Sequence, residues 1–310
     1  MKSADPATLT VAYDTATGGR AELGVPVGPA VQRTYWQSVG RRVRRDSYTV
    51  ICAAVLLLIT AAAVFAPWLG LDDPTFSNVA KRLLPVGSPD HVLGTDELGR
   101  DMLSRLIYGG RLSLMMGVLP VAAALLIGGA LGLIAGFASG RTNMAIMRVT
   151  DVFYAFPSIL LAVAIAGSLG AGLTNALLAI TIVFIPPITR VTESVTTQVR
   201  TMDFVEAARA SGASTYAIIR VHILGNVLGP ILVYATVLVS VSILIAAGLS
   251  FIGLGASPPA AEWGLMLNTL RESIFLAPLN SVLPGFMIFV TSMCFNLISD
   301  GLRSAMDVRF

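Results

Sequence analysis

The sequence predicts an all-α integral membrane protein with six transmembrane helices and a structured polar loop between the fourth and the fifth. Composition is the first reason: of 310 residues, 55% are hydrophobic and 13% charged, and the mean hydropathy is +0.77. A soluble domain carries about 25% charged residues, so most of this surface must face lipid or other protein. Secondly, the apolar residues gather into segments near the roughly 20 residues that a helix needs to cross a bilayer. The third reason is residues 190–226, a polar interval that contains helix-capping residues.

Six segments are apolar and long enough to be membrane spans. They are residues 48–66, 112–138, 152–169, 173–189, 227–249 and 281–298. The third and fourth are separated only by the turn GSLGAG, which predicts a helical hairpin. Pro186 and Pro187 lie near the inner end of the fourth segment. Because proline removes a helical hydrogen bond, we expect these two residues to bend or end that helix.

The basic residues predict the orientation. The run RRVRR immediately precedes the first span, and positive residues favour the cytoplasmic side, so we expect both termini in the cytoplasm. We divide the chain into a partly disordered cytosolic tail at 1–46, a first span with an extracytoplasmic loop at 47–111, and a five-helix core at 112–310. The net charge of +3 is too small to indicate a nucleic-acid partner.

The apolar segments lack the residues that ion coupling or catalysis requires. No charged residue or histidine lies in the middle of a segment, which argues against a proton relay. The chain has two lysines, Lys2 and Lys81, and neither follows the glycines of an ATP-binding P-loop. We therefore expect no enzyme activity, and any ATP-driven step requires ATP hydrolysis in another subunit.

The histidines and cysteines predict neither a metal site nor a cofactor in this chain. His91 and His222 are isolated in the sequence. Cys52 and Cys294 lie in apolar segments without a CxxC spacing, as expected of buried thiols that pack as small hydrophobic side chains.

Three glycines predict a close helix contact in the second span. Gly128, Gly132 and Gly136 recur every four residues and therefore share one helix face. Small residues let two membrane helices approach closely and pack. The sequence does not identify the partner helix.

The polar interval predicts two short helices with a break between them. Asp203 can cap the first helix, and Glu206 can reach back to complete a capping box. Gly212 offers the left-handed conformation that ends many helices, and Ser214 is placed to cap the next one.

The first short helix is small as well as capped, because Ala207 and Ala208 have almost no side-chain bulk. Such a helix can fit closely into a groove on a partner. It can equally be a plain connector between two spans, and the residue types alone favour neither interpretation.

Five ordered sequence blocks decide between these interpretations. EAARASG, at 206–212, resembles the EAA motif of bacterial ATP-binding-cassette (ABC) importer permeases. The other four blocks are similar to the peptide/nickel-type permeases of that family. They are HVLGTDELGRDMLSRLIYGGRLSL at 91–114, DVFYAFPSILLA at 151–162, LSFIGLGASPPAAEWGLML at 249–267 and FNLISDGLR at 295–303. The blocks follow the family's order over about residues 40–310.

The resemblance implies the fold of a type I ABC importer permease in the bacterial inner membrane. The implied partners are a second homologous permease subunit, two ABC ATPase subunits that bind ATP and Mg²⁺, an extracytoplasmic solute-binding protein and the lipid bilayer. It also implies that the loop at 190–226 contains the coupling helix. The residues expected to couple the ATPases to the spans are Asp203, Glu206, Ala207, Ala208 and Gly212.

Di- and oligopeptides are the substrate that the resemblance implies. Glutathione and chelated nickel are alternatives within the family, and an ion-coupled secondary transporter is the alternative outside it. Two departures from the family pattern stand in this chain. Leu224 is followed by Gly225 where Leu-Pro is common, and Ala246 stands where relatives often have glutamate.

The outer segment from Gly94 to Arg105 allows two roles. Its acidic and basic residues can pair with one another in a solvated structural loop, or they can contact the binding protein or the second permease. We favour the structural role.

Overall fold

The computed structural model describes residues 35–306, and this part of the chain is helical, with no named strand. The predicted all-α class is confirmed. The disorder predicted for part of the tail at 1–46 concerns residues before Tyr35, which lie outside the described residues. Within the predicted cytosolic tail at 1–46, residues 35–45 form a helix.

Long apolar helices are joined at their ends by short ones. The first half contains α1 (Tyr35–Arg45), α2 (Ser47–Phe65), α3 (Met102–Ala138), α4 (Gly140–Tyr154), α5 (Ser158–Leu169) and α6 (Leu173–Arg200). The second half contains α7 (Asp203–Ala210), α8 (Thr215–Ala217), the π-helical segment η3 (Ile218–Ile223), α9 (Leu224–Phe251), α10 (Trp263–Leu270) and α11 (Pro278–Met306). Short 3₁₀ turns, η1 (Ala66–Trp68), η2 (Val79–Lys81) and η4 (Arg271–Ser273), lie in the connections.

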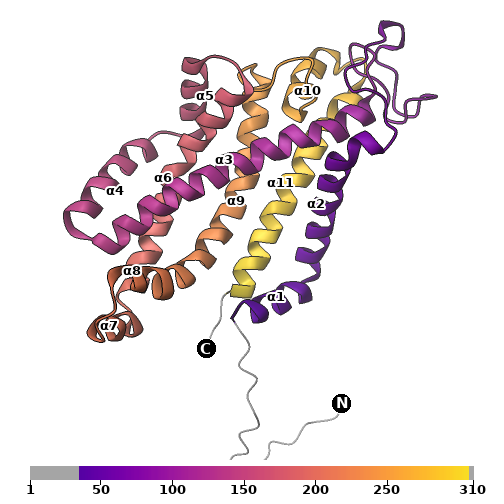
Figure 1. The fold of residues 1–310 in the computed structure, drawn as a ribbon. Helices are drawn as coiled ribbons and strands as arrows, with labels where there is room; N and C mark the ends of the chain where they lie inside the picture. The colour runs from indigo at the N-terminus through magenta and orange to yellow at the C-terminus, as the bar shows by residue number, and fades with distance from the viewer. Residues whose placement is uncertain (1–34, 307–310) are drawn as a thin grey trace, which may run out of the picture.

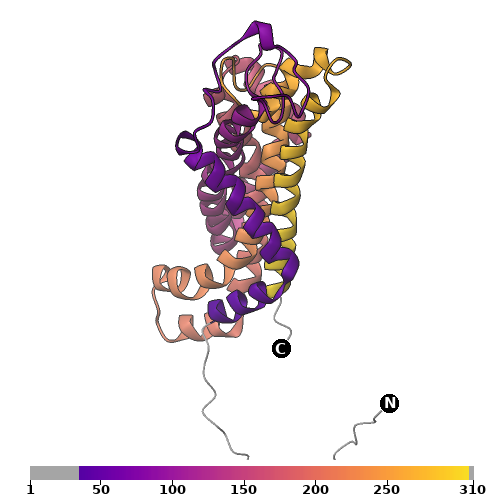
Figure 2. The same ribbon diagram turned by 90° about the vertical axis from the view of Figure 1, so that its right-hand side faces the viewer.

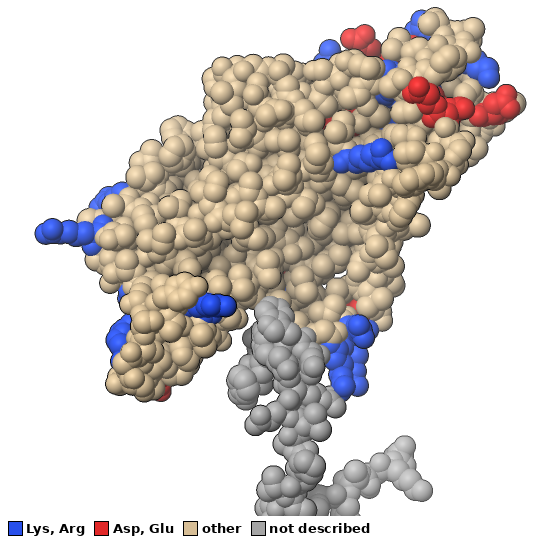
Figure 3. Space-filling view, in the orientation of Figure 1, with Lys and Arg blue, Asp and Glu red and all other residues tan. Residues whose placement is uncertain are grey.

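Five helical runs between residues 35 and 306 are long and apolar enough to cross a membrane, and the bent pair α4–α5 makes six if it counts as one span. Figure 1 shows α1, α7 and α8 at one end of the bundle and α10 at the other. We call these the α7 end and the α10 end. On the face shown in Figure 3, a wide band of uncharged surface lies between the charged side chains at the edges.

The third span differs from its prediction as one continuous helix over 152–169. The chain breaks between α4 and α5, whose axes differ by 86°. Pro157 explains the break because it has no amide hydrogen and disfavours helical geometry at the preceding residue. At about 1.5 Å per residue, the 12 residues of α5 are too short to cross a bilayer alone. The predicted hairpin with the fourth span does form, since α5 packs on α6.

The two prolines of the fourth span do not end its helix. Helix α6 continues through Pro186 and Pro187 and ends at Arg200, eleven residues beyond the predicted boundary at Thr189. It therefore carries the chain without interruption to the short helices at the α7 end.

Helices α3 and α6 make the most extensive helix contact in the described chain, along the predicted glycine face. A Cβ atom built on Gly128 would lie 2.7 Å from the carbonyl oxygen of Ile185. The equivalent distances are 2.5 Å for Gly132 to Thr189 and 2.7 Å for Gly136 to Glu193. No side chain fits in these spaces, so the two backbones touch directly. We call this contact the glycine seam.

The glycine seam also fixes the direction of the helices. Each contact advances by four residues on both α3 and α6, so the two helices run parallel. A chain can form two parallel neighbouring spans only if the segment between them crosses back. The bent pair α4–α5 is that segment (Figure 1), and this supports counting it as one span.

We expect Gly132→Ala to destabilise the protein and Gly129→Ala to leave it equally or more stable. The added methyl group of Gly132→Ala collides with the backbone of α6, and overpacking of this kind costs about 1–3 kcal/mol. A Cβ on Gly129 meets nothing within 4 Å, and alanine favours a helix by up to about 1 kcal/mol over glycine. Thermal unfolding of the two variants in detergent measures the difference. Equal melting temperatures would contradict the glycine seam.

Candidate functional site

A short helical hairpin of α7, α8 and η3 projects from the α7 end of the bundle (Figures 1 and 2). Its turn depends on Gly212, whose φ of +79° is the left-handed conformation predicted from the sequence. The amide of Ala213 then donates to the carbonyl of Ala208 at 3.1 Å, closing the end of α7. The predicted cap at Ser214 is confirmed as well, because its hydroxyl accepts from the amide of Ala217 at 3.3 Å.

The predicted capping box is wrong. The N-cap of α7 is Met202, whose carbonyl accepts from the amides of Val205 and Glu206 at 2.9 and 3.2 Å. The helix therefore begins one residue before the position that a cap by Asp203 requires. Asp203 and Glu206 lie instead in the first turn with exposed side chains, where their negative charge is favourable next to the helix N-terminus.

One buried side chain holds α7 against the bundle. Val205 has no exposed surface and belongs to an apolar cluster formed by the end of α6, η3 and the start of α9. The other buried members of this cluster are Val199, Ile218, Ile223, Val227 and Ile231. Val205 thus joins α7 to two long helices, α6 and α9.

The five residues predicted to act in coupling do not all share one surface. Asp203, Glu206, Ala207 and Gly212 are exposed on the hairpin. Ala208 is half-buried and packs against the apolar cluster beneath α7. Its small side chain therefore sets how closely α7 approaches the bundle, and it presents little surface to a partner.

The hairpin also exposes large apolar side chains that the sequence analysis did not select. Tyr216 is 70% exposed and Val221 66% exposed. Phe204 is 40% exposed and stacks near His222, with 6.2 Å between the ring centroids. Exposed large apolar side chains next to charged residues are typical of a protein-binding site. For Phe204 the reason is that a helix of two turns, such as α7, has too short a pattern to show which face is buried.

The connection into the fifth span is continuous. The chain passes from α8 through the π-helical η3 into α9 without a break, and this whole run forms one span. Gly225, where the family commonly has proline, therefore does not interrupt the helix. Single π-helical turns within α-helices often lie at functional sites.

A polar contact next to the glycine seam joins three helices. Asn143, near the start of α4, donates to the carboxylate of Glu193 on α6 at 2.6 Å and to the carbonyl of Ala135 on α3 at 3.2 Å. The hydroxyl of Thr197 also donates to Glu193, at 3.3 Å. The α7 ends of α3, α4 and α6 are thus linked to one another.

The outer segment from Gly94 to Arg105 has the structural role that we favoured, but it is buried rather than solvated. Asp96 is 2% exposed and accepts from Arg100 at 2.6 Å, with Arg105 at 3.2 Å. Arg105 also donates to the carbonyl of Pro74 at 2.9 Å. These buried ion pairs fix the loop before α3 against the start of that helix.

A second buried carboxylate orders the α10 end. Glu262 is 1% exposed and caps α10 by accepting from the amides of Gly264 and Leu265 at 2.9 and 2.8 Å. It also accepts from the hydroxyl of Ser113 on α3 at 3.0 Å. This charge is therefore fully engaged in joining α10 to α3.

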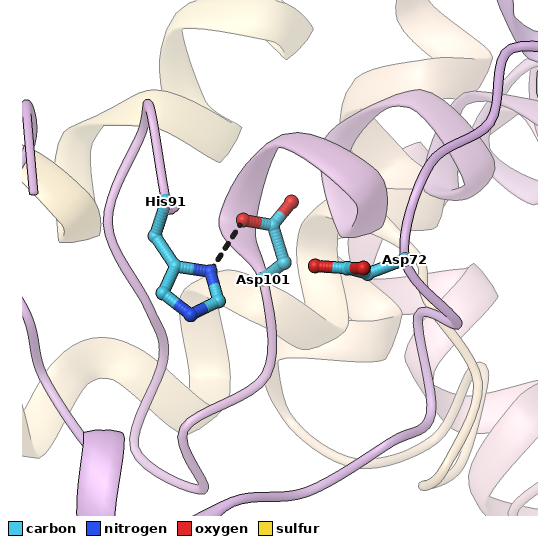
Figure 4. Close-up of side chains that lie close together, drawn as sticks. All are labelled: Asp72, His91 and Asp101. Atoms are coloured by element: carbon cyan, nitrogen blue, oxygen red, sulfur yellow. Dashed lines mark hydrogen bonds and ion pairs between the residues drawn. The ribbon is translucent and has the colours of Figure 1, made fainter. Parts of the chain in front are cut away.

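The sequence spacing predicted that His91 is isolated, and this prediction is wrong for the folded chain. Ligand atoms of Asp72, His91 and Asp101 all lie within 4.8 Å of one another (Figure 4). The three residues come from separate turns of the connection between α2 and α3, so no short motif predicts their meeting.

Two family models match the chain. The model of the binding-protein-dependent transport system inner membrane component matches residues 128–310, which is more than half of the chain. The model of the N-terminal transmembrane domain of oligopeptide transport permease C matches residues 34–85.

Similar proteins cover nearly the whole chain. The di/tripeptide transport system permease protein DppC of Pseudomonas aeruginosa is 42% identical over 286 residues, which are 91% of this chain and 93% of that protein. The glutathione transport system permease protein GsiD of Pectobacterium atrosepticum is 40% identical over 275 residues, with coverages of 89% and 91%. An inward-facing structure of the MetNI methionine ABC transporter has a TM-score of 0.56 at 19% identity, covers 67% of this chain and 98% of that chain, and shows a shared fold.

We expect Val205→Ala to loosen α7 without unfolding the bundle. The substitution deletes two methyl groups from a buried site, at about 0.8 kcal/mol each. Local opening of residues 203–212 should then become about tenfold more frequent. Hydrogen exchange of these amides measures the change. The control is Tyr216→Ala, which removes a larger but 70% exposed side chain. Equal protection of α7 in both variants would contradict anchoring by Val205.

Proposed function

The chain belongs to the family of binding-protein-dependent transport system inner membrane components and is the permease subunit of an ABC importer; from this premise we propose that it forms, with a second homologous permease subunit, the membrane pathway for di- or oligopeptides. The names of the relatives support this substrate class, because they specify dipeptides, di- and tripeptides and glutathione. Glutathione is itself a short peptide, so one pathway chemistry suits all three.

The α7 hairpin docks on an ABC ATPase subunit in this proposal. The exposed surface of the hairpin is the observation that carries it: Ala207 and Gly212 leave room for close contact, and Phe204, Tyr216 and Val221 supply apolar area. Asp203 and Glu206 add negative charge at the rim. Val205 keeps α7 attached to the bundle, as transmission of a movement requires.

The transport step then follows from the attachment of the helices. The ATPase subunits bind ATP with Mg²⁺ and close, and their closure displaces the docked α7 hairpins. Helices α6 and α9 move with α7 because they share its apolar cluster. Helix α3 follows α6 because of the glycine seam, and α4 follows through Asn143 and Glu193. The pathway between the two permeases switches sides as these groups move together.

The arginines of α1 support an orientation with the α7 end in the cytoplasm of a bacterium and the chain in the inner membrane. Arg41, Arg42, Arg44 and Arg45 are exposed at the α7 end, and positively charged residues next to spans favour the cytoplasmic side. The α10 end then faces outward, where an extracytoplasmic solute-binding protein delivers the substrate.

Affinity purification of this chain from its native membranes in mild detergent tests the assembly. We expect mass spectrometry to find a second permease, P-loop ATPase subunits and a solute-binding protein. The ligand of that binding protein then tests the substrate class independently. Recovery of the chain alone, in detergent that preserves other ABC complexes, would contradict the proposed assembly.

We expect Ala207→Arg to separate the chain from its ATPase subunits while membrane insertion is unchanged. A bulky charge in a closely packed contact costs about 1–3 kcal/mol, so retention of ATPase on the immobilised permease should fall about tenfold. Ser304→Arg is the matched control, since Ser304 is exposed near the same end of the bundle but on α11. Undiminished retention with Ala207→Arg would remove α7 as the docking element.

A further inference from the structure

The cluster of Asp72, His91 and Asp101 at the α10 end is not used by the proposed transport mechanism. Nδ1 of His91 lies 3.0 Å from Oδ1 of Asp101, and the Asp72 carboxylate points toward the pair (Figure 4). These atoms therefore converge on one point from three turns of the connecting segment. Such convergence is the first requirement for ligands of a single metal ion.

The second observation is the setting of these side chains. The side chains of His91 and Asp101 are 10% and 9% exposed, whereas Asp72 is exposed to solvent. The three residues line a small cavity of about 150 Å³, which Asp73 and Lys81 also line. A water molecule in the liquid takes about 30 Å³, so the cavity has room for an ion and several waters. An ion can enter on the side of Asp72.

The remaining contacts of Asp101 keep its ligand atom in place. Oδ2 of Asp101 accepts from the amide of Ser104 at 2.7 Å and thereby caps α3. Oδ1 is thus directed to His91 by the rigid start of a long helix. Secondary contacts of this kind orient metal ligands and strengthen binding.

The charges around the cavity favour a cation. Asp72, Asp73 and Asp101 contribute three carboxylates to its lining, and Lys81 contributes one positive charge. Lys81 lies 3.5 Å from Nε2 of His91 and 3.8 Å from Asp90. When Nδ1 binds a metal, the proton of the neutral ring moves to Nε2. Lys81, which is 44% exposed, then has to turn away from the ring toward Asp90.

We propose that Asp72, His91 and Asp101 bind one divalent first-row transition ion of the Zn²⁺ class at the outer end of the permease. One imidazole and two carboxylates suit such an ion, whereas Mg²⁺ and Ca²⁺ prefer all-oxygen sites. The ion joins the start and the middle of the connection between α2 and α3 to Asp101, the N-cap of α3. Its role is structural: it fixes the loop that covers the α10 end.

The test is Zn²⁺ binding to the full-length chain, purified with the subunits that accompany it and stripped with a chelator. Equilibrium dialysis and thermal unfolding over a range of Zn²⁺ concentrations give affinity and stabilisation. We expect the wild type to bind one more Zn²⁺ per chain than Asp72→Asn or His91→Gln. The affinity of these two variants for Zn²⁺ should be at least about tenfold lower. Glu272→Gln is the control and keeps the site, because the Glu272 side chain is 83% exposed and does not line the cavity.

Lys81→Ala distinguishes metal binding from a plain histidine–aspartate hydrogen bond. The variant removes the positive charge next to His91, so it should raise the Zn²⁺ affinity several-fold. Loss of Zn²⁺ binding in Asp72→Asn cannot be attributed to misfolding, because Asp72 is exposed. In the absence of Zn²⁺ this variant should unfold at the same temperature as the wild type. Equal Zn²⁺ binding by the wild type and Asp72→Asn, or weaker binding by Lys81→Ala, would overturn the proposal and leave His91–Asp101 as a structural pair.

Discussion

The direct contact of two backbones along α3 and α6 is the constraint on which this fold depends. Lipid is as apolar as leucine, so membrane helices gain little from burying apolar side chains against each other. They associate through close packing, which glycine at 128, 132 and 136 permits. The parallel direction of this contact forces α4 and α5 to return the chain across the bundle. It also brings Glu193 next to Asn143, so the seam and its polar neighbour hold three helices together.

Polar and charged groups follow a different rule at the two ends of the bundle. At the α10 end, two carboxylates are buried and paired: Asp96 with arginines, and Glu262 with the amides that it caps. This end is therefore rigid around α3. At the α7 end, Asp203 and Glu206 are exposed and a single buried valine, Val205, attaches α7. The α10 end is thus fixed by its own contacts, whereas the α7 end keeps exposed surface on its hairpin.

Most of the spans could be predicted because length and hydropathy are local properties of the chain. The left-handed Gly212 and the cap at Ser214 were predictable for the same reason. The failures depended on neighbours. The capping box failed because α6 ends where Met202 can start α7. The break at Pro157 was missed because the apolar run around it predicted one continuous span. The inward position of Ala208 and the meeting of Asp72 with His91 depend on tertiary contacts that no spacing encodes.

The break between α4 and α5 has a consequence for where the protein can meet lipid. Residues 151–160 are exposed throughout in the isolated chain. The 12 residues of α5 place the break about 18 Å from the turn into α6, which is near the middle of a hydrocarbon core. Backbone groups without helical partners are tolerated at that depth only against protein or water. This chain therefore has one side that the acyl chains cannot solvate. A lone copy in a bilayer would leave the backbone groups on that side without hydrogen-bond partners.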